Sequence, residues 1–283
     1  MTHARYNKLR FDDLQVSLDH LLLGTPRTEL LRDPAVGVMT LGSCFALELA
    51  GALRRLGRPA TSWPIVESVN TPLFNRVLLQ ALVDGPGSQH FADMDAVHDG
   101  QLSGDAERIR QELARTQIAI LTVGVGFLWR RKGGAVSLRP DPRSLDQYET
   151  FYPSTQEQAR ILVDVANLLR RLGPSHIFLT VSPIPAEMAL DYASPVIADC
   201  VSKSMLRAAV HEAMRSDPSL RYWPSFEFFR WISGHASRAF FGQDGKVRHA
   251  DRDLVEIVVS RFLQWHGHRE VDPSDPGLRS SVS

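Results

Sequence analysis

Stretches of consecutive apolar residues alternate along this chain with stretches in which apolar residues recur every three or four positions. The apolar runs at 36–42, 118–129 and 176–185 predict buried strands. Segments with helical periodicity lie between and after these runs. Buried strands that alternate with helices are typical of a mainly parallel sheet covered on both faces. The pattern therefore predicts an α/β fold.

The remaining segments extend this alternation. Shorter strands are expected in "PATSWPI" (59–65) and "LRYWPSFEFF" (220–229), and a turn-rich surface loop or small hairpin at 85–104. Helices are expected at 46–57, 72–85, 105–116, 154–174, 194–214 and 251–266. We expect one domain over 36–268. Residues 1–35 form an irregular lead-in with a short helical turn in "TPRTELLRD", and 269–283 form a disordered tail.

Composition narrows the class of protein. Lys+Arg and Asp+Glu are both 32, and no basic stripe stands out, which argues against nucleic acid and against an anionic membrane surface as partners. The sequence has neither a signal peptide pattern nor 18 successive apolar residues, so we expect a cytoplasmic protein without membrane insertion. Two cysteines, Cys44 and Cys200, are too few for a disulfide framework.

In a parallel α/β sheet the ligand crevice lies at the carboxyl ends of the strands. The residues that directly follow the predicted strands are therefore the candidates for a binding site. They are Gly42, Ser43, Cys44, Gly124, Gly126, Ser182, Ser225 and Glu227.

Cys44 stands at the first turn of a predicted helix, directly after a strand. Unpaired N–H groups and the helix dipole at that position can lower the pKa of a thiol, and the thiolate is the attacking species. Ser43 is a second potential nucleophile, although a serine at this place is commonly a helix cap. The alternative for Cys44 is a small buried residue that packs the helix on the sheet.

A candidate base lies near the end of the chain, in "FFGQDGKVRHADRDLVEIV". His249 could act as a general base, oriented by Asp244 five residues earlier. Asp251 competes for that role but is better placed as a helix cap, and a solvated surface histidine is the alternative for His249. The sequence shows no metal-ligand spacing, dinucleotide fingerprint or P-loop, so no metal or required cofactor is expected.

These motifs together resemble the GSCFA family, whose name stands here as Gly42-Ser43-Cys44-Phe45-Ala46. "LTVSPIPAE", "DCVSKSMLRAAV", "YWPSFEFF" and "RHADRDLVEIVVSRF" look like further blocks of the family, in the same order. The family is similar in turn to the SGNH (GDSL-like) hydrolases. That resemblance implies a three-layer sandwich with a flavodoxin-like, SGNH-type sheet.

The resemblance also implies roles for individual residues. Cys44 matches the SGNH nucleophile, Ser43 the preceding aspartate, and His249 the histidine of the last block, whereas Asp244 is two residues further from the histidine than the family spacing. The asparagine of the SGNH oxyanion hole is missing at Gly124-Val125-Gly126. An oxyanion would then depend on the N–H groups of Cys44 or Gly126, or on another side chain such as Asn70.

We therefore expect an acyl-transfer enzyme, either an esterase or an O-acyltransferase, that acts on a carbohydrate or another small hydroxylated substrate. Acyl-CoA is a possible donor, and the glycan substrate rests on the resemblance alone. The alternative is a non-catalytic SGNH-like protein that binds a sugar-like or nucleotide-like ligand in the same crevice. The sequence leaves the oligomeric state open.

Overall fold

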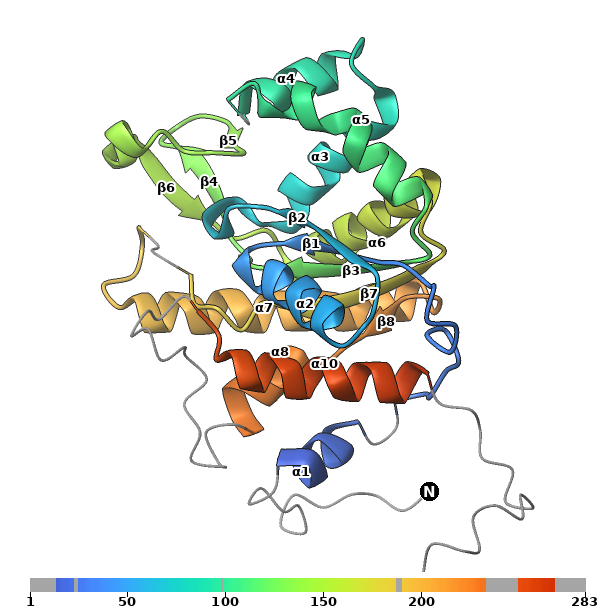
Figure 1. Cartoon of the computed structure of the whole chain (residues 1–283). Coiled ribbons are helices and arrows are strands. Elements are labelled where there is room, and N and C mark those ends of the chain that lie inside the picture. Colours follow the sequence, from blue (N-terminus) through green and yellow to red (C-terminus); the bar gives the residue numbers. More distant parts are fainter. Residues whose placement is uncertain (1–13, 23–24, 98, 187–189, 233–248, 268–283) are drawn as a thin grey trace, which may run out of the picture.

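Five parallel strands form the central sheet, in the order β2-β1-β3-β7-β8 (Figure 1). The computed structural model describes residues 14–22, 25–97, 99–186, 190–232 and 249–267. The strands are β1 (Val38–Gly42), β2 (Ala60–Pro64), β3 (Ile118–Val123), β7 (His176–Val181) and β8 (Arg221–Tyr222). Counted along the chain, this is the order 2-1-3-4-5 of flavodoxin-like sheets. The predicted α/β fold is confirmed.

Helices cover both faces of this sheet and make it the middle layer of a three-layer sandwich (Figure 1). One face packs on α2 (Cys44–Arg55) and α10 (Arg252–His266). The other face packs on α3 (Pro72–Asp84), α6 (Thr155–Leu172) and α7 (Pro195–Ser216). Alternate residues of β3 point to opposite faces, since Ile118 and Ile120 belong to the first core and Ala119 and Leu121 to the second.

Helix starts follow the local sequence closely. Thr71 caps α3 by accepting a hydrogen bond from the Phe74 N–H, and Ser154 and Glu157 form the expected capping box of α6. Asp251 caps α10 through the Leu254 N–H at 3.0 Å. Short-range capping therefore sets these boundaries, as the sequence indicates.

Three segments differ from the sequence expectations. Residues 85–104 are not a loop or hairpin, because they contain α4 (Gln89–Val97) and the start of α5 (Gln101–Ala114), whose apolar side chains pack in the core. Residues 25–33 contain one hydrogen-bonded turn, in which the Arg32 N–H donates to the Glu29 carbonyl at 3.0 Å, and the helix α1 (Leu14–Leu21) lies earlier in the lead-in. The apolar run 118–129 breaks after β3, and its end starts a second sheet.

This second sheet is small and antiparallel. It contains β5 (Val136–Ser137), β4 (Leu128–Arg131) and β6 (Tyr148–Phe151) in that order, followed along the chain by α6. The short 3₁₀ helix η3 (Pro142–Gln147) precedes β6. The strand expected over 220–229 is limited to β8, and the residues after it are helical, with α8 (Ser225–Glu227) and the π-helical turn η4 (Phe228–Ile232). No helix within the described part of the chain is long and apolar enough to cross a membrane.

Acidification is expected to destabilise the fold through His266. Its side chain is 1% exposed among the rings of Phe178, Trp223 and Phe262. Burial, helped by the charge of Arg221, lowers its pKa from 6.5 to about 4. Between these two values the unfolded chain binds a proton that the folded protein does not, so stability falls as the pH falls, by at most about 3 kcal/mol.

Urea unfolding at neutral pH and near pH 4.5 would measure this loss. His266→Phe keeps an aromatic ring in the same place and removes the titrating group, so the variant should lose less stability on acidification than the wild type. Equal losses in the two proteins would contradict the assignment.

Candidate functional site

The turn between β1 and α2 forms a sharp elbow at the carboxyl edge of the sheet. Gly42 has φ +137°, and a Cβ at this residue would lie 2.5 Å from the Thr122 carbonyl oxygen of the adjacent strand. Only glycine fits this backbone without strain. The chain runs from β1 to β2 on one side and returns to β3 on the other, so Cys44 lies at the topological switch point, where ligands of such sheets bind.

Cys44 and His249 line one cavity of about 230 Å³ beside this elbow. Ile65 and Val66 form one wall, and Ile184 and Pro185 form the other. Cys44 comes from the start of α2 and His249 from the segment before α10, more than two thirds of the chain later. The thiol and the imidazole that the sequence pairs are therefore brought to the same cavity.

The second wall is held by a buried ion pair. Asp199 of α7 accepts a hydrogen bond from the Ala186 N–H at 2.8 Å and contacts Arg230 at 2.6 Å. Arg230 also donates to the Pro183 carbonyl at 2.8 Å. These contacts tie the loop after β7 to two helical segments and position the apolar residues that face Cys44.

Glu67, which no motif in the sequence singles out, also lines this cavity. It begins the 3₁₀ helix η2 (Glu67–Val69), and its side chain is 13% exposed. Its Oε1 lies 3.4 Å from the Nζ of the fully buried Lys203, which donates to the Gly124 carbonyl at 2.5 Å. Its Oε2 is buried and has no hydrogen-bond partner among the described residues. The Glu67 carboxylate therefore lines the cavity and keeps one buried oxygen without a partner.

Two opposing effects act on the Cys44 thiol. Burial and then the negative charge of Glu67 raise its pKa, whereas hydrogen bonding from the Phe45 N–H, the Ser43 hydroxyl and the Cys44 N–H lowers it. The net direction is upward from the ordinary value. The helix start does act on the sulfur as the sequence predicts, but burial and Glu67 outweigh it, so the thiol is protonated at neutral pH.

Replacing Glu67 with glutamine is expected to lower the pKa of the Cys44 thiol, because the variant loses the negative charge that disfavours the thiolate and leaves the positive charge of Lys203 nearby. The rate of iodoacetamide alkylation against pH measures this pKa. The assay uses the Cys200→Ala background, since Cys200 is the other free thiol and is exposed.

Glu48→Gln is the matched control, since Glu48 lies one turn beyond Cys44 on the same helix. It should leave the alkylation profile unchanged. A profile in Glu67→Gln that does not move to lower pH would refute the role of Glu67.

The other residues predicted at the elbow are already engaged within the protein. The Gly126 N–H donates to the Ser202 hydroxyl at 2.8 Å, and the Gly124 N–H donates to the Asn70 carbonyl at 2.9 Å. The fully buried Asn70 amide donates to the Thr122 carbonyl at 2.7 Å. These groups stabilise the loops around the elbow and do not line the Cys44 cavity. The N–H groups at the start of α2 and the Ser43 hydroxyl are the donors that reach the sulfur.

Ser43 occupies the N-cap position of α2, but its hydroxyl makes no capping hydrogen bond, contrary to the expected cap. It is fully buried. Ser43 therefore lies beneath the elbow, and Cys44 is the residue of the pair that reaches the cavity.

The residues after β7 and β8 lie apart from Cys44. Ser182 is fully buried and accepts a hydrogen bond from the Ile184 N–H, and Ser225 lies 2.6 Å from Thr180. Glu227 binds Arg207 at 2.6 Å and Tyr222 at 2.7 Å, and it lines a separate cavity at the β8 edge. Of these candidates the structure brings only Cys44 and His249 together. Asp244 lies outside the described residues.

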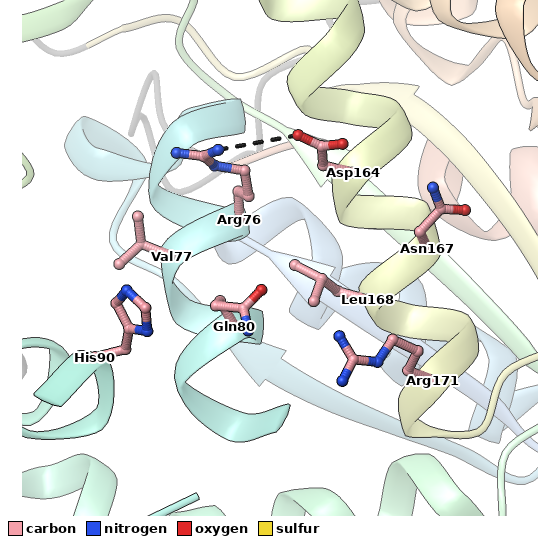
Figure 2. Close-up of a pocket in the computed structure, with 8 residues that line it drawn as sticks. All are labelled: Arg76, Val77, Gln80, His90, Asp164, Asn167, Leu168 and Arg171. Atoms are coloured by element: carbon pink, nitrogen blue, oxygen red, sulfur yellow. Dashed lines mark ion pairs between the residues drawn. The ribbon is translucent and has the colours of Figure 1, made fainter. Parts of the chain in front are cut away.

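A larger cavity of about 400 Å³ lies between α3 and α6. Figure 2 shows Arg76 and Asp164 pointing toward one another across it, 3.9 Å apart, with Gln80 and Arg171 further along. The side chains that line it include neither a thiol nor a hydroxyl. This cavity therefore offers no thiol or hydroxyl nucleophile for covalent acyl chemistry.

Comparison with known proteins agrees with the elbow motif and with the order of the later blocks. No curated protein matches the chain. The model of the GSCFA family matches residues 37–262, which include the elbow, both walls of the Cys44 cavity and most of α10. The match spans most of the sequence, and this chain belongs to the GSCFA family.

Proposed function

We propose that this protein transfers an acyl group through a thioester on Cys44, as an esterase or an O-acyltransferase. The observation that supports the proposal is the shared cavity of Cys44 and His249 at the switch point of the sheet. A thiol and an imidazole that line one cavity supply the nucleophile and the base that acyl transfer requires. The cavity of about 230 Å³ suits an acyl group better than a whole sugar, so the remainder of donor and acceptor would lie outside it.

Because the pKa of Cys44 is raised, the thiol would need a base that removes its proton during the attack. The sulfur carries its proton in the free protein, so His249 acts as a general base and removes that proton while the C–S bond forms. The imidazolium then returns the proton to the leaving group as its bond to the carbonyl carbon breaks. In the second half, water or an acceptor hydroxyl attacks the thioester carbonyl while His249 takes its proton. The C–S bond then breaks, and the imidazolium returns that proton to the Cys44 sulfur.

The substrate class rests on the resemblance to polysaccharide-linked relatives and on the chemistry of the site. The carboxylate of Glu67, which lines the same cavity, can accept a hydrogen bond from a hydroxyl group of the acceptor. A glycan or another small hydroxylated molecule offers such groups. Acyl-CoA or an activated ester would supply the acyl group, without a required cofactor.

The test is to trap the acyl-protein in the Cys200→Ala background. Purified protein is incubated with p-nitrophenyl acetate or acetyl-CoA and analysed by intact mass spectrometry. We expect one added acetyl group that is absent in Cys44→Ala, forms far more slowly in His249→Ala, and persists in Ser43→Ala. Absence of an adduct with both donors, or an adduct that survives Cys44→Ala, would rule out the thioester.

A second candidate is a non-catalytic protein that binds a ligand in this cavity. The observations that favour it are the raised pKa of Cys44 and the engagement within the protein of two expected oxyanion donors, the Gly126 N–H and the Asn70 amide. This reading predicts no adduct, and thermal stabilisation by a bound sugar that is retained in Cys44→Ala.

A further inference from the structure

A second cavity, of about 870 Å³, lies at the β8 edge of the central sheet between α7 and α10. We call it the edge cavity. It shares no lining residue with the Cys44 cavity. Its volume falls within the range of small-molecule sites, and apolar side chains such as Phe178, Met214 and Leu220 form much of its lining.

His266 supplies a buried polar group to the edge cavity. Its Nδ1 lies 2.9 Å from the Thr28 hydroxyl, whereas its Nε2 is buried and finds no hydrogen-bond partner in the described part of the chain. Buried polar atoms are nearly always hydrogen-bonded in folded proteins. The unpartnered Nε2 of a histidine that lines a cavity is therefore a group that a bound ligand can satisfy.

Arg221 supplies a positive charge to the same cavity. The nearby carboxylate of Glu227 is already bound by Arg207 and by the Tyr222 hydroxyl, and the contact of Arg207 with the Tyr222 ring, 4.2 Å from its centroid, completes that cluster. Within the described residues, the Arg221 guanidinium has no carboxylate partner. Its one hydrogen bond there is a long contact of 3.4 Å to the Ser219 carbonyl. The edge cavity therefore combines an apolar lining with one uncompensated guanidinium.

We propose that the edge cavity binds a small apolar molecule with a single anionic group, such as a carboxylate. The anion would lie between the Arg221 guanidinium and His266 Nε2, and the apolar body would contact Phe178, Met214 and Leu220. This arrangement requires the tautomer with the proton on Nε2, in which the Thr28 hydroxyl donates to Nδ1. An anion in an apolar cavity needs hydrogen-bond donors. The Arg221 guanidinium, which has no carboxylate partner, and the unpartnered Nε2–H of His266 would supply them.

Calorimetric titration of the full chain with four naphthalene compounds tests which charge the ligand of the edge cavity must carry. The probes are naphthoate, naphthalenemethanol and naphthylmethylammonium, and naphthalenesulfonate separates a carboxylate from another monoanion. We expect saturable binding of naphthoate, binding of the alcohol that is weaker by about tenfold or more, and no binding of the cation. Binding should be unchanged in Cys44→Ala, which separates this site from the proposed acyl chemistry.

Two variants test the residues. Arg221→Met keeps the apolar stem and should weaken naphthoate binding by about tenfold or more without affecting the alcohol, and His266→Phe should also weaken it. Arg27→Met is the matched control, since Arg27 is an exposed arginine stacked on Trp265 at the same edge and does not line the cavity. Thermal melts verify that each variant folds.

The proposal is overturned if none of the probes binds at millimolar concentration. It is also overturned if the alcohol binds as tightly as naphthoate, or if folded Arg221→Met binds naphthoate like the wild type. Stronger binding of the sulfonate than of naphthoate would keep the site and assign it to sulfonate-like or phosphate-like anions.

Discussion

Lys203→Met is expected to reduce the free energy of unfolding by about 3–5 kcal/mol. Lys203 is fully buried on α7, and its ammonium contacts Glu67 and the Gly124 carbonyl. Methionine fills a similar volume but leaves the carboxylate of Glu67 without its counter-ion and the Gly124 carbonyl without its donor. The loss follows because breaking one side of a buried pair costs more than the pair contributes.

Urea unfolding of a double-mutant cycle measures this effect. Glu67→Gln in the Lys203→Met background removes the orphaned charge, so the double variant should be more stable than Lys203→Met alone, by about 1–3 kcal/mol. Arg108→Met is the control for an exposed pair with Asp105 and Glu112, and it should change stability by less than about 1 kcal/mol. A loss in Lys203→Met no greater than in this control would contradict the buried pair.

Gly42→Ala is expected to reduce stability by at least about 3 kcal/mol and to displace the elbow. The residue has φ +137°, and the new Cβ would lie 2.5 Å from the Thr122 carbonyl oxygen and 2.9 Å from the Thr122 Cβ. Both contacts are with the adjacent strand β3, which is fixed in the core. Relief of the overlap requires β1 and β3 to separate at the point where Cys44 enters the cavity.

Gly57→Ala separates the two causes of this loss. Gly57 has φ +79°, and a Cβ there meets nothing within 4 Å, so its cost is that of the left-handed backbone alone, about 1 kcal/mol. The excess loss in Gly42→Ala therefore measures the overlap with β3. Equal losses in thermal or urea unfolding would show that the elbow tolerates a side chain and that Gly42 is not required there.

The local sequence was sufficient for the alternation of the core strands with most of the helices and for the elbow. Apolar periodicity identified the core strands and most of the helices, and the caps at Thr71, Ser154 and Asp251 are formed by residues within three positions of each helix start. Prediction failed at 85–104, where turn-prone residues outweighed the scattered apolar positions. There the packing of Phe91, Met94 and Leu102 in the core stabilises two helices.

In the candidate site, too, some features follow from the local sequence and others from tertiary packing. The sequence by itself determined that a thiol stands at the end of the first strand, that His249 precedes the last helix, and that the chain carries the family motif, because these depend on residue type and short spacing. Only the tertiary structure decided what surrounds the thiol. Glu67 and Lys203 are 136 residues apart, and no local pattern pairs them.

The tertiary structure also assigned the remaining candidates to different places. The N–H of Gly126 is bound by Ser202 from α7, and Glu227 faces the edge cavity and not Cys44. Each of these outcomes depends on which helix packs over which strand end. Strand order and helix packing bring together side chains that are far apart in the sequence. Their burial and hydrogen bonds fix the charge and the donors around Cys44. The periodicity of residues along the chain does not encode these contacts.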